Sequence, residues 1–325
     1  MGKNIMEEKD KWSCKVCGKS FSSERGLHIH IPREHKITLA EYYTNFYPRL
    51  NLLTGEPLSF KDKKEYFRKS FENISELTQW SKNAEKEEVK KLILDLLRNR
   101  IIDKDWSHAP DYLELKLCEL PPIDLYRNFF GSYSKACELL KIKPLFEKQM
   151  MANFFSSTIP EDMEILVDTR EQAPLTFPRS RIMKLDFGDY TTTSKYYNYT
   201  YVDRKSESDF KGSIGKGFQR LRRELKRAKE FDSFLYIVVE ESLDGIIKHN
   251  YNSPFHSTSM AFLWHNMRKL THEFQGHCQF IFSGSRQDSE DLIPRLLYFG
   301  KKMWQVDLQY YIDKRHDLGN WKSEI

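Results

Sequence analysis

The stretch Ile165–Ser206 reads ILVDTREQAPLTFPRSRIMKLDFGDYTTTSKYYNYTYVDRKS, and it decides the fold. It holds three β-rich runs, Ile165–Thr169, Arg181–Tyr190 and Tyr199–Lys205, which turn-prone and Pro-containing segments separate. Charged side chains stand at the strand ends, where buried strands would carry Val or Ile: Asp168, Arg170, Glu171, Asp189, Asp203 and Lys205. Acids at the ends of adjacent strands predict a divalent-cation site, because Mg²⁺ prefers carboxylate oxygens and keeps several of its waters.

Strand geometry groups some of these side chains. Asp203 and Lys205 project to one side of their strand, and Arg204 points to the other. Together with Asp189 on the preceding strand, they are a minimum set for metal-assisted hydrolysis of a phosphodiester. The two acids would hold the metal, and Lys205 would orient or help deprotonate the attacking water and offset charge on the phosphate. The alternative is a surface salt bridge among solvated acids, because Asp-x-Lys alone is a common pattern.

Taken whole, the stretch resembles the XPF family of nucleases, which belongs to the restriction-enzyme-like group with a PD-(D/E)xK core. The matching motifs are VDTRE, GDY, and DRK followed by three residues and Asp209. Their order and spacing are those of the family, and the resemblance covers residues 165 to 304. It implies a restriction-endonuclease-like α/β domain that uses Mg²⁺ or Mn²⁺ to cut duplex DNA near branches, flaps or junctions. It also implies a homodimer or a heterodimer with one active subunit.

The resemblance assigns roles residue by residue. The metal-binding acids of the family fall on Asp168, Asp189 and Asp203, and its lysine falls on Lys205. Its supporting residues fall on Arg170, Glu171, Arg204 and Asp209. One position departs from the pattern: the family usually has Glu-Arg-Lys, and this chain has Asp-Arg-Lys, with Asp203 in place of the glutamate. The shorter side chain would draw the metal closer to the strand.

Composition sets outer bounds. A chain of 325 residues exceeds the usual size of one hydrophobic core and indicates two or three units. The net charge of +5 is mild, so affinity for nucleic acid must come from the distribution of charge. No apolar run approaches the ~20 residues that cross a bilayer, and the N-terminal stretch lacks the apolar core of a secretory signal. We therefore expect an intracellular protein without a membrane partner, whose five cysteines are free thiols or metal ligands.

Residues 1–36 predict a C₂H₂ zinc finger of the ββα type. The candidate Zn²⁺ ligands are Cys14, Cys17, His30 and His35, with C-x₂-C and H-x₄-H spacings and twelve residues between the pairs. Phe21 and Leu27 match the two core hydrophobes of such a finger. Four protein ligands close a tetrahedral site and leave no open position, so this zinc is expected to be structural.

The finger does not carry a clear code for DNA sequence. Base contacts come from helix positions −1, 3 and 6, which here are Ser23, Gly26 and Ile29. Neither of the last two makes the bidentate hydrogen bonds that identify a purine. Arg25 and Arg33 could meet phosphates, which position a protein without specifying sequence. The pattern favours a docking module for DNA or for protein.

The region from residue 37 to residue 150 reads as mostly helical. Ala84–Ile102 has apolar residues at helical spacing, and Tyr42–Tyr47 is more typical of a packed aromatic helix face than of a base-stacking surface. Residues 103–144 weakly resemble the small helical repeat that accompanies some homing endonucleases, which is a presumed DNA-binding unit. An αα-hairpin with an aromatic core explains this segment equally well.

The nuclease-like domain is expected at residues 160–304, as a mixed central sheet flanked by helices, followed by a tail at 305–325. A helix is predicted over Ser208–Glu230, then a central strand at Phe234–Val239. Further elements are expected as helices near 257–274 and 287–302 and a strand at 278–283. The basic face of the first helix is predicted to bind DNA phosphates through Lys211, Lys216, Arg220, Arg223 and Arg227.

The sequence thus predicts a Mg²⁺-dependent DNA endonuclease acting on branched DNA in repair, recombination or replication. Two alternatives stay open. One is a homing-type endonuclease that prefers a DNA site, and the other is a catalytically silent DNA-binding scaffold. Inactive members of the family lose the GDY acid or the lysine, whereas this chain keeps Asp189, Asp203 and Lys205, which favours an enzyme.

Overall fold

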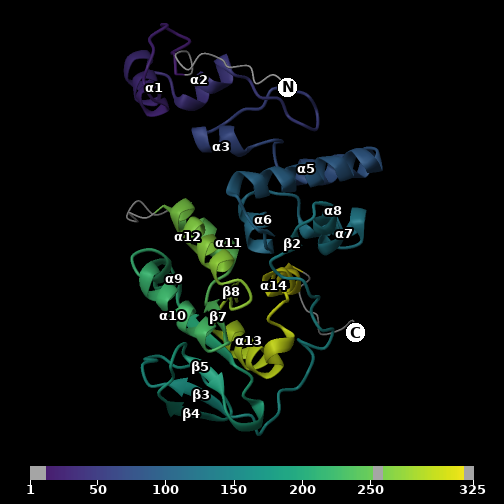
Figure 1. Ribbon diagram of the computed structural model, residues 1–325, viewed down its shortest axis with the longest axis vertical. Coiled ribbons are helices and arrows are strands. Elements are labelled where there is room, and N and C mark those ends of the chain that lie inside the picture. Colours follow the sequence, from purple (N-terminus) through teal and green to yellow (C-terminus); the bar gives the residue numbers. More distant parts are fainter. Residues whose placement is uncertain (1–11, 252–258, 318–325) are drawn as a thin grey trace.

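The computed structural model describes residues 12–251 and 259–317. The molecule is elongated, with the Cys/His finger at one end, a helical layer in the middle and a β-sheet domain at the other end (Figure 1). The N-terminal residues 1–11, part of the predicted finger domain, and residues 318–325 of the predicted tail lie outside the described part of the chain. No helix among the described residues is long and apolar enough to cross a membrane.

The sheet domain contains six strands in the order β4-β3-β5-β6-β7-β8. The strands are β3 (Ile165–Asp168), β4 (Ser180–Met183), β5 (Tyr190–Thr192), β6 (Thr200–Lys205), β7 (Phe234–Val239) and β8 (Cys278–Phe282). β5 runs antiparallel to both of its neighbours, and the other pairs are parallel. The predicted mixed sheet flanked by helices is confirmed, and β7 has the predicted bounds, because a run of six apolar residues can only be buried on both faces.

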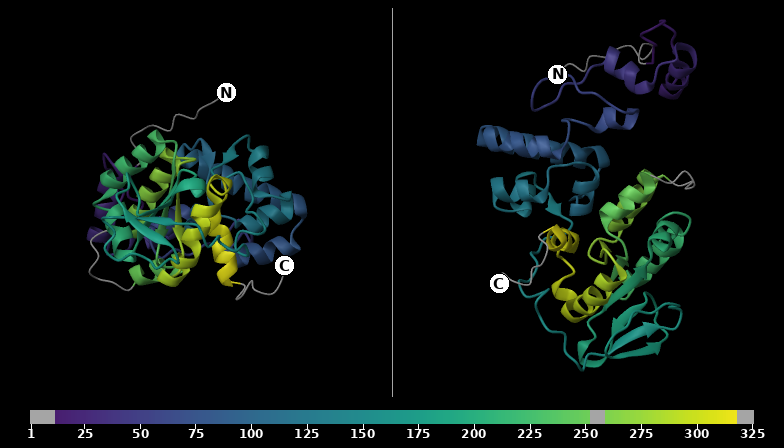
Figure 2. Two further views of the ribbon diagram at one scale, coloured as in Figure 1. Left: turned by 90° about the horizontal axis from the view of Figure 1, so that it is seen from below. Right: turned by 180° about the vertical axis from the view of Figure 1, so that it is seen from behind.

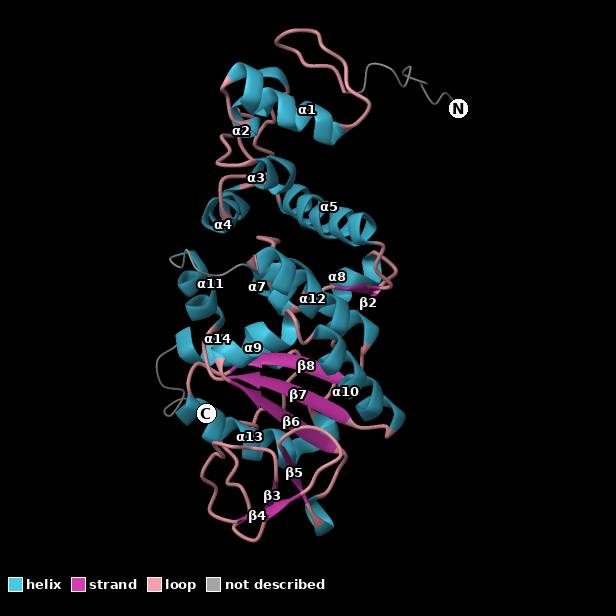
Figure 3. Ribbon diagram, turned by 90° about the vertical axis from the view of Figure 1, so that its left-hand side faces the viewer, coloured by secondary structure: helices cyan, strands magenta, loops and turns pink. Residues whose placement is uncertain are grey.

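Helices cover both faces of the sheet (Figure 2; Figure 3). On one face lie α9 (Glu207–Ile214), α10 (Phe218–Glu230) and α12 (Met260–Glu273), and the short α11 (Leu243–Tyr251) adds to the same core. On the other face lie α13 (Arg286–Phe299) and α14 (Leu308–Asp317). Alternate residues of β6 and β7 enter the two cores, so the strands position whatever projects from their ends.

Two predicted elements differ from the structure, and the predicted start of a third lies outside the described residues. Arg181–Tyr190 is not one strand: it divides into β4 and β5, because Gly188 turns the chain at φ +67° and a Cβ there would lie 3.0 Å from the carbonyl of Val202. The predicted helix Ser208–Glu230 is broken between α9 and α10 at Gly215–Gly217. The helix expected near 257–274 is present as α12 (Met260–Glu273). The first two residues of the predicted range lie outside the described part of the chain.

The segment after residue 305, expected to be a tail, contributes α14 to the sheet domain. Gln309 is buried there, and its side chain accepts a hydrogen bond from the backbone N–H of Phe282 at 2.7 Å and donates one to the carbonyl of the same residue at 3.2 Å. Leu308 and Ile312 enter the core between α13 and the sheet. Because the side-chain amide of Gln309 completes the backbone bonding of β8 at its end, this helix is part of the domain.

The middle region is helical, as predicted. Its elements are α2 (Leu39–Phe46), α3 (Lys63–Arg68), α4 (Ile74–Asn83), α5 (Lys86–Lys104), α6 (Tyr112–Leu117), α7 (Ile123–Phe130) and α8 (Tyr133–Leu139), with a two-stranded pair β1 (His108–Ala109) and β2 (Lys143–Pro144). α7 and α8 form a hairpin that turns at Gly131 and buries Tyr126. This is the geometry of the αα-hairpin, and the likeness of this segment to a DNA-binding repeat stays a prediction.

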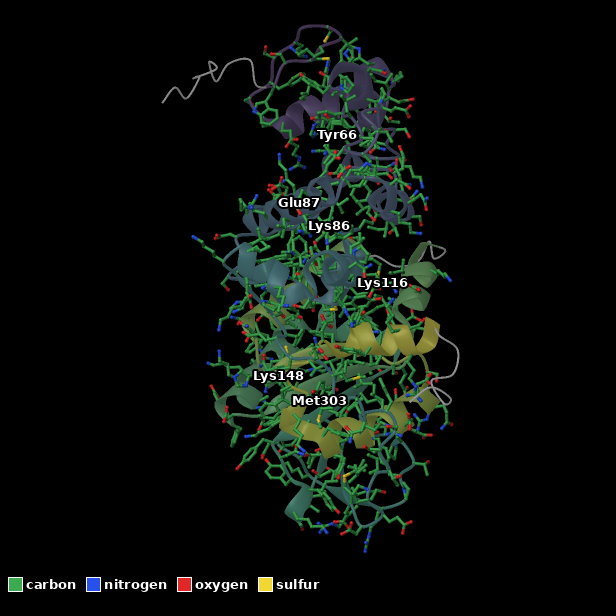
Figure 4. The ribbon with its side chains drawn as sticks, turned by 90° about the vertical axis from the view of Figure 1, so that its right-hand side faces the viewer. Tyr66, Lys86, Glu87, Lys116, Lys148 and Met303 are labelled. Carbon is green, nitrogen blue, oxygen red and sulfur yellow. The ribbon has the colours of Figure 1, made fainter. Side chains whose placement is uncertain are left out.

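A buried carboxylate joins the helical layer to the sheet domain. Glu114 of α6 accepts hydrogen bonds from Arg100 of α5 and from Arg268 of α12, the latter with Nε at 2.6 Å. Both guanidinium groups also face the ring of Trp106, at 5.7 and 5.8 Å. Nearby, Lys116 pairs with carboxylates of α11 and α14 at 3.1 and 2.9 Å (labelled in Figure 4). A buried charge of this kind is stable only while its partners stay in place.

We expect this junction to weaken in acid through His272. Its ring stacks on Trp106 with a centroid distance of 4.6 Å, and burial lowers the pKa of His272 to about 4, the positive charge of Arg268 and nearby His108 adding to the effect and Glu114 opposing it. The unfolded state therefore binds the extra proton between about pH 6.5 and pH 4, so the free energy of unfolding falls over that window, by about 3 kcal/mol in total. Thermal unfolding measured across this window tests the prediction.

His272→Phe keeps the stack and removes the titrating group, so the slope of stability against pH should become shallower. His265→Phe is the matched control, because His265 is exposed on the same helix and its replacement should leave the slope unchanged. Equal slopes for all three proteins would contradict the prediction.

Candidate functional site

The strand register brings the three predicted aspartates to the same end of the sheet, where β3 and β6 end and β5 begins. Val167 pairs with Tyr190, and Tyr190 pairs with Val202, so the next step along each strand sets Asp168 beside Asp189 and Asp189 beside Asp203. The backbone N–H of Asp168 donates to the carbonyl of Asp189 at 2.8 Å. The start of antiparallel β5 thus lies against the ends of β3 and β6.

The carboxylate of Asp168 faces its own loop. It accepts hydrogen bonds from the backbone N–H and the guanidinium of Arg170 and from the N–H of Leu185, at 2.6 to 3.1 Å. Burial opposes ionisation, but these donors lower the pKa of Asp168 below its ordinary value. Among the described residues, only the cysteines and histidines of the finger place three or more ligand atoms within 4.8 Å of one another. Asp168 therefore orders the loop after β3, and the three predicted aspartates do not bring their carboxylates within 4.8 Å of one another.

Asp189, Asp203 and Lys205 form the centre of the site. Asp203 and Lys205 are both buried, with Nζ of Lys205 2.9 and 2.7 Å from the two carboxylate oxygens. Oδ2 of Asp189 accepts the backbone N–H of Arg204 at 2.8 Å. Alternation along β6 puts Asp203 and Lys205 on one face of the strand, as predicted from the sequence, and α10 covers that face.

A fourth side chain, Glu224 of α10, completes this group and was missed in the sequence. Its Oε1 accepts the N–H of Gly188 at 2.9 Å, directly before Asp189. The charges of Asp203 and Lys205 both act on it. The available signal was its place as the one acid between Lys211 and Lys229, next to the buried Leu225 of a basic helix. The spacing of the catalytic motifs gave no reason to look there.

The group of Asp189, Asp203, Glu224 and Lys205 contains more acidic than basic side chains, and this excess helps to shift the pKa values of three of them. Burial and the neighbouring Asp203 raise the pKa of Asp189 to about 8, and the same two causes raise the pKa of Glu224. Burial disfavours the charged form of Lys205, but the carboxylates of Asp203, Asp189 and Glu224 together outweigh burial and raise the pKa of this lysine. Lys205 is therefore a fixed ammonium group, suited to meeting negative charge and unsuited to removing a proton.

These residues have the donor types of a divalent-cation site, but in this structure the ligand atoms of the three carboxylates are not gathered within 4.8 Å of one another as those of the finger are. Asp189, Asp203 and Glu224 offer three carboxylates, and within the group Lys205 is the single cation. Oδ2 of Asp203 is buried and accepts no well-aligned hydrogen bond, although the lysine ammonium is close. Hard oxygen ligands with uncompensated charge are the donor set of Mg²⁺ and Mn²⁺.

Arg204 and Glu171 lie on the opposite face of the sheet. The guanidinium of Arg204 pairs with Glu171 at 2.9 Å and with Glu240, at the end of β7, at 2.7 Å. The backbone N–H of the same arginine holds Asp189. Arg204 thus ties the loop after β3 to two strands and positions Asp189, and its side chain does not join the carboxylate group.

Two other predicted residues serve local structure. Asp209 is exposed in the first turn of α9, where its carboxylate accepts the hydroxyl of Ser206 at 2.7 Å. Lys211 is mostly buried in an ion pair with Glu207 at 2.5 Å, so it is not available for phosphate. The remaining predicted DNA-binding residues of this region, Lys216, Arg220, Arg223 and Arg227, are exposed.

The three exposed arginines among these residues form a stripe on α10, which we name the arginine stripe, next to Glu224. Arg220, Arg223 and Arg227 are three and four residues apart on α10, which places them on one side of the helix. Glu224 lies within this run, and the charge of Arg227 acts on it. A phosphate backbone bound to the stripe would therefore pass next to Lys205.

The finger brings its four predicted ligands together. Sγ of Cys14 lies 3.4 Å from Nε2 of His35, Sγ of Cys17 lies 3.3 Å from Nε2 of His30, and the two histidine nitrogens are 3.1 Å apart. A tetrahedral Zn²⁺ site would have S–N and N–N edges of about 3.6 and 3.4 Å, so the donor set fits zinc.

The histidine spacing determines the local helix type. α1 (Glu24–His30) continues into a π-helical turn at Ile31–His35. The wider π turn puts residues five apart on one face, which is what the H-x₄-H spacing requires. Tyr42 of α2 is fully buried against this unit, and its hydroxyl accepts the N–H of Lys15 at 2.8 Å. The packed unit therefore continues beyond residue 36, and Arg25 and Arg33 are exposed on it.

A family model matches most of the sheet domain. Residues 156–296, less than half of the chain, match the family model of the ERCC4 domain. No curated protein matches the sequence. A structure of XPF from Aeropyrum pernix in complex with DNA is similar, with 20% identity and a TM-score of 0.31 over 42% of this chain and 63% of that chain. A structure of XPF from Aeropyrum pernix has 19% identity and a TM-score of 0.32 over 46% of this chain and 71% of that chain.

Proposed function

We propose that this chain is a divalent-metal-dependent DNA endonuclease that cuts branched or flapped duplex DNA. The observation that carries the proposal is the group of Asp189, Asp203, Lys205 and Glu224 inside the segment that matches the ERCC4 domain. A buried ammonium surrounded by carboxylates at the edge of a sheet suits phosphodiester hydrolysis. The arginine stripe of α10 supports DNA as the substrate.

Each residue of the group has a separate task in this proposal. Asp189, Asp203 and Glu224 would hold Mg²⁺ or Mn²⁺, which supplies an activated water and stabilises charge on the phosphate when bound. Lys205 stays protonated and meets the negative charge that develops on the phosphate oxygens. Arg204 holds Asp189 in place through its backbone N–H, and Asp168 with Arg170 keeps the neighbouring loop folded.

One observation favours the alternative of a catalytically silent DNA-binding protein. The carboxylate of Asp168 is neutralised by Arg170, and that of Asp203 is paired with Lys205, so two of the three predicted metal ligands are already engaged by cations. A protein whose acids serve only as internal salt bridges would show this arrangement as well.

An assay of the purified protein on linear, flap, fork and four-way-junction DNA, with Mg²⁺ or Mn²⁺, tests the proposal. Cutting near the branch supports it. Cutting of linear DNA at one site would favour a homing-type enzyme, and binding without cutting under all conditions would favour the silent protein.

Glu224→Gln tests the missed carboxylate. The amide keeps an oxygen for the Gly188 N–H and removes the charge, so the fold should persist while the Mg²⁺ concentration for half-maximal cleavage rises about 10- to 100-fold. Cleavage rates measured over a range of Mg²⁺ concentrations give this value. Glu230→Gln, at the exposed end of the same helix, is the control. An unchanged Mg²⁺ requirement in Glu224→Gln would remove this residue from the site.

We also propose that the finger binds one structural Zn²⁺ through Cys14, Cys17, His30 and His35. The support is the convergence of their four ligand atoms within 4.8 Å. Its exposed arginines, Arg25 and Arg33, would contact phosphate without reading sequence.

A further inference from the structure

Three exposed aromatic side chains lie near one another, before the start of β6 and at the end of α10. The exposed fractions of Tyr197, Tyr199 and Phe231, which we name the aromatic patch, are 38%, 45% and 58%. They are linked by ring contacts: the first two rings are 4.9 Å apart, and the buried rings of Tyr201 and Phe187 connect them to Phe231. Three large aromatic rings left open to solvent in one contiguous group indicate a binding surface.

The backbone under the patch is held in an unfavourable conformation. Tyr199 has φ +64°, in the left-handed region that bulky residues rarely adopt. The carbonyl of Tyr199 accepts the N–H of Phe234 at 2.9 Å, and the neighbouring Asn198 side chain donates to the carbonyl of Leu297 at 2.6 Å. These contacts fix the turn and present the Tyr199 ring at the surface. Such conformations concentrate at ligand-binding sites.

The rim of the patch carries positive charge. Nζ of Lys301 lies 4.7 Å from the centre of the Tyr199 ring. Arg227 of the arginine stripe stands one helical turn before Phe231, which closes α10. Asp186, whose charge acts on Tyr201, is an acid at the same rim. Aromatic faces between a lysine and an arginine suit a ligand that combines flat rings with phosphates.

The patch and the candidate site lie toward opposite ends of β6. Tyr201 and Asp203 point to the same face of β6 and are two residues apart, about 7 Å along the strand. Phe187 precedes Asp189 by two residues in the same way. Because the rings of Tyr201 and Phe187 are buried in the core under α10, a strand on the patch would reach the carboxylate group over the arginine stripe, past Arg227.

We propose that the aromatic patch binds the unpaired nucleotides of the DNA substrate by stacking their bases on Tyr197, Tyr199 and Phe231. The inference rests on the proposed function, since it takes DNA as the substrate. Base stacking on aromatic rings tolerates any sequence, so the patch selects DNA with a single-stranded segment next to a duplex. The exposed aliphatic side chains Ile182 and Met183 lie on edge strand β4, outside the patch, and have no part in this recognition.

The test measures binding of uncleaved DNA in EDTA, by fluorescence anisotropy with a single-stranded oligonucleotide, a flap and a blunt duplex. The triple variant Tyr197→Ala, Tyr199→Ala, Phe231→Ala should bind the single strand and the flap at least about tenfold more weakly, with duplex binding unchanged. Phe231→Ala alone should show a smaller loss in the same direction, and its exposed position leaves the fold intact. Tyr199→Phe should bind like the parent, because the ring remains.

Ile182→Ala is the matched control, as an aliphatic side chain with 70% exposure on the same sheet, and it should bind all three DNAs like the parent. A 2-aminopurine base in the flap should lose its stacking-induced quenching in the triple variant. Parent-like binding of the single strand and flap by both aromatic variants, or an equal loss on blunt duplex, would overturn the proposal. Either result would indicate a protein-docking or purely structural patch. The proposed function fails separately, if the parent cuts no DNA.

Discussion

Lys205→Ala will lower the rate of Mg²⁺-dependent DNA cleavage by about 10²- to 10³-fold, while affinity for DNA stays within about twofold of the parent. The side chain is buried and fixed by Asp203, so its ammonium group is pre-organised toward a phosphate and needs no reorganisation during the reaction. In the proposed function, DNA binding depends mainly on the exposed arginine stripe, which the substitution does not change. Single-turnover cleavage and anisotropy binding in EDTA measure the two quantities.

Lys184→Ala is the matched control, because this lysine is exposed in the loop of the same motif stretch and should leave the cleavage rate unchanged. Asp189→Asn should reduce cleavage to a similar extent by removing a metal-binding charge. If the Lys205 and Asp189 variants cut as fast as the parent, the site is not the catalytic centre. If they lose DNA binding in proportion, their role is structural.

Removal of zinc will unfold the finger and leave the sheet domain folded. Binding of structural Zn²⁺ to such sites is worth about 10–16 kcal/mol, more than a unit of this size gains from its own core. Hydrogen exchange should therefore show loss of protection in the α1–α2 unit after chelation, with the strands of the sheet still protected. Metal analysis of the untreated protein should give one zinc per chain.

Cys17→Ala should reproduce the effect of chelation, because it removes one of the four ligands. Cys137→Ala is the control, since this buried cysteine of α8 belongs to no cluster of ligand atoms among the described residues. One zinc per chain in the Cys17 variant, with a protected finger, would show that the metal lies elsewhere.

Much of the sheet domain could be predicted because its signals are local. An uninterrupted apolar run gives β7, and alternation gives the faces of Asp203 and Lys205. The approximate place of the acids followed from their positions at the strand ends. The direction of β5 did not, because an antiparallel strand of three residues has no signature of its own in the sequence.

The parts that could not be predicted depend on tertiary contacts. Glu224 approaches the site only because α10 crosses the sheet at that point, and no spacing within the motifs encodes this. The orientation of the Asp168 carboxylate depends on Arg170 and on the N–H of Leu185, seventeen residues away. The split between α9 and α10 had a visible signal in Gly215 and Gly217, which outweighs a continuous pattern of apolar residues.

The carboxylate of Glu114 is enclosed by the guanidinium groups of Arg100 and Arg268. These two ion pairs hold the helical layer rigidly against the sheet domain. Swinging α5 and α6 away from α12 would strand a buried negative charge, so hinge motion at this joint is disfavoured. If the helical layer contacts DNA, as the resemblance of residues 103–144 predicts, that contact lies at a fixed distance from Lys205. An endonuclease built in this way would cut DNA at one fixed distance from the feature that the helical layer contacts.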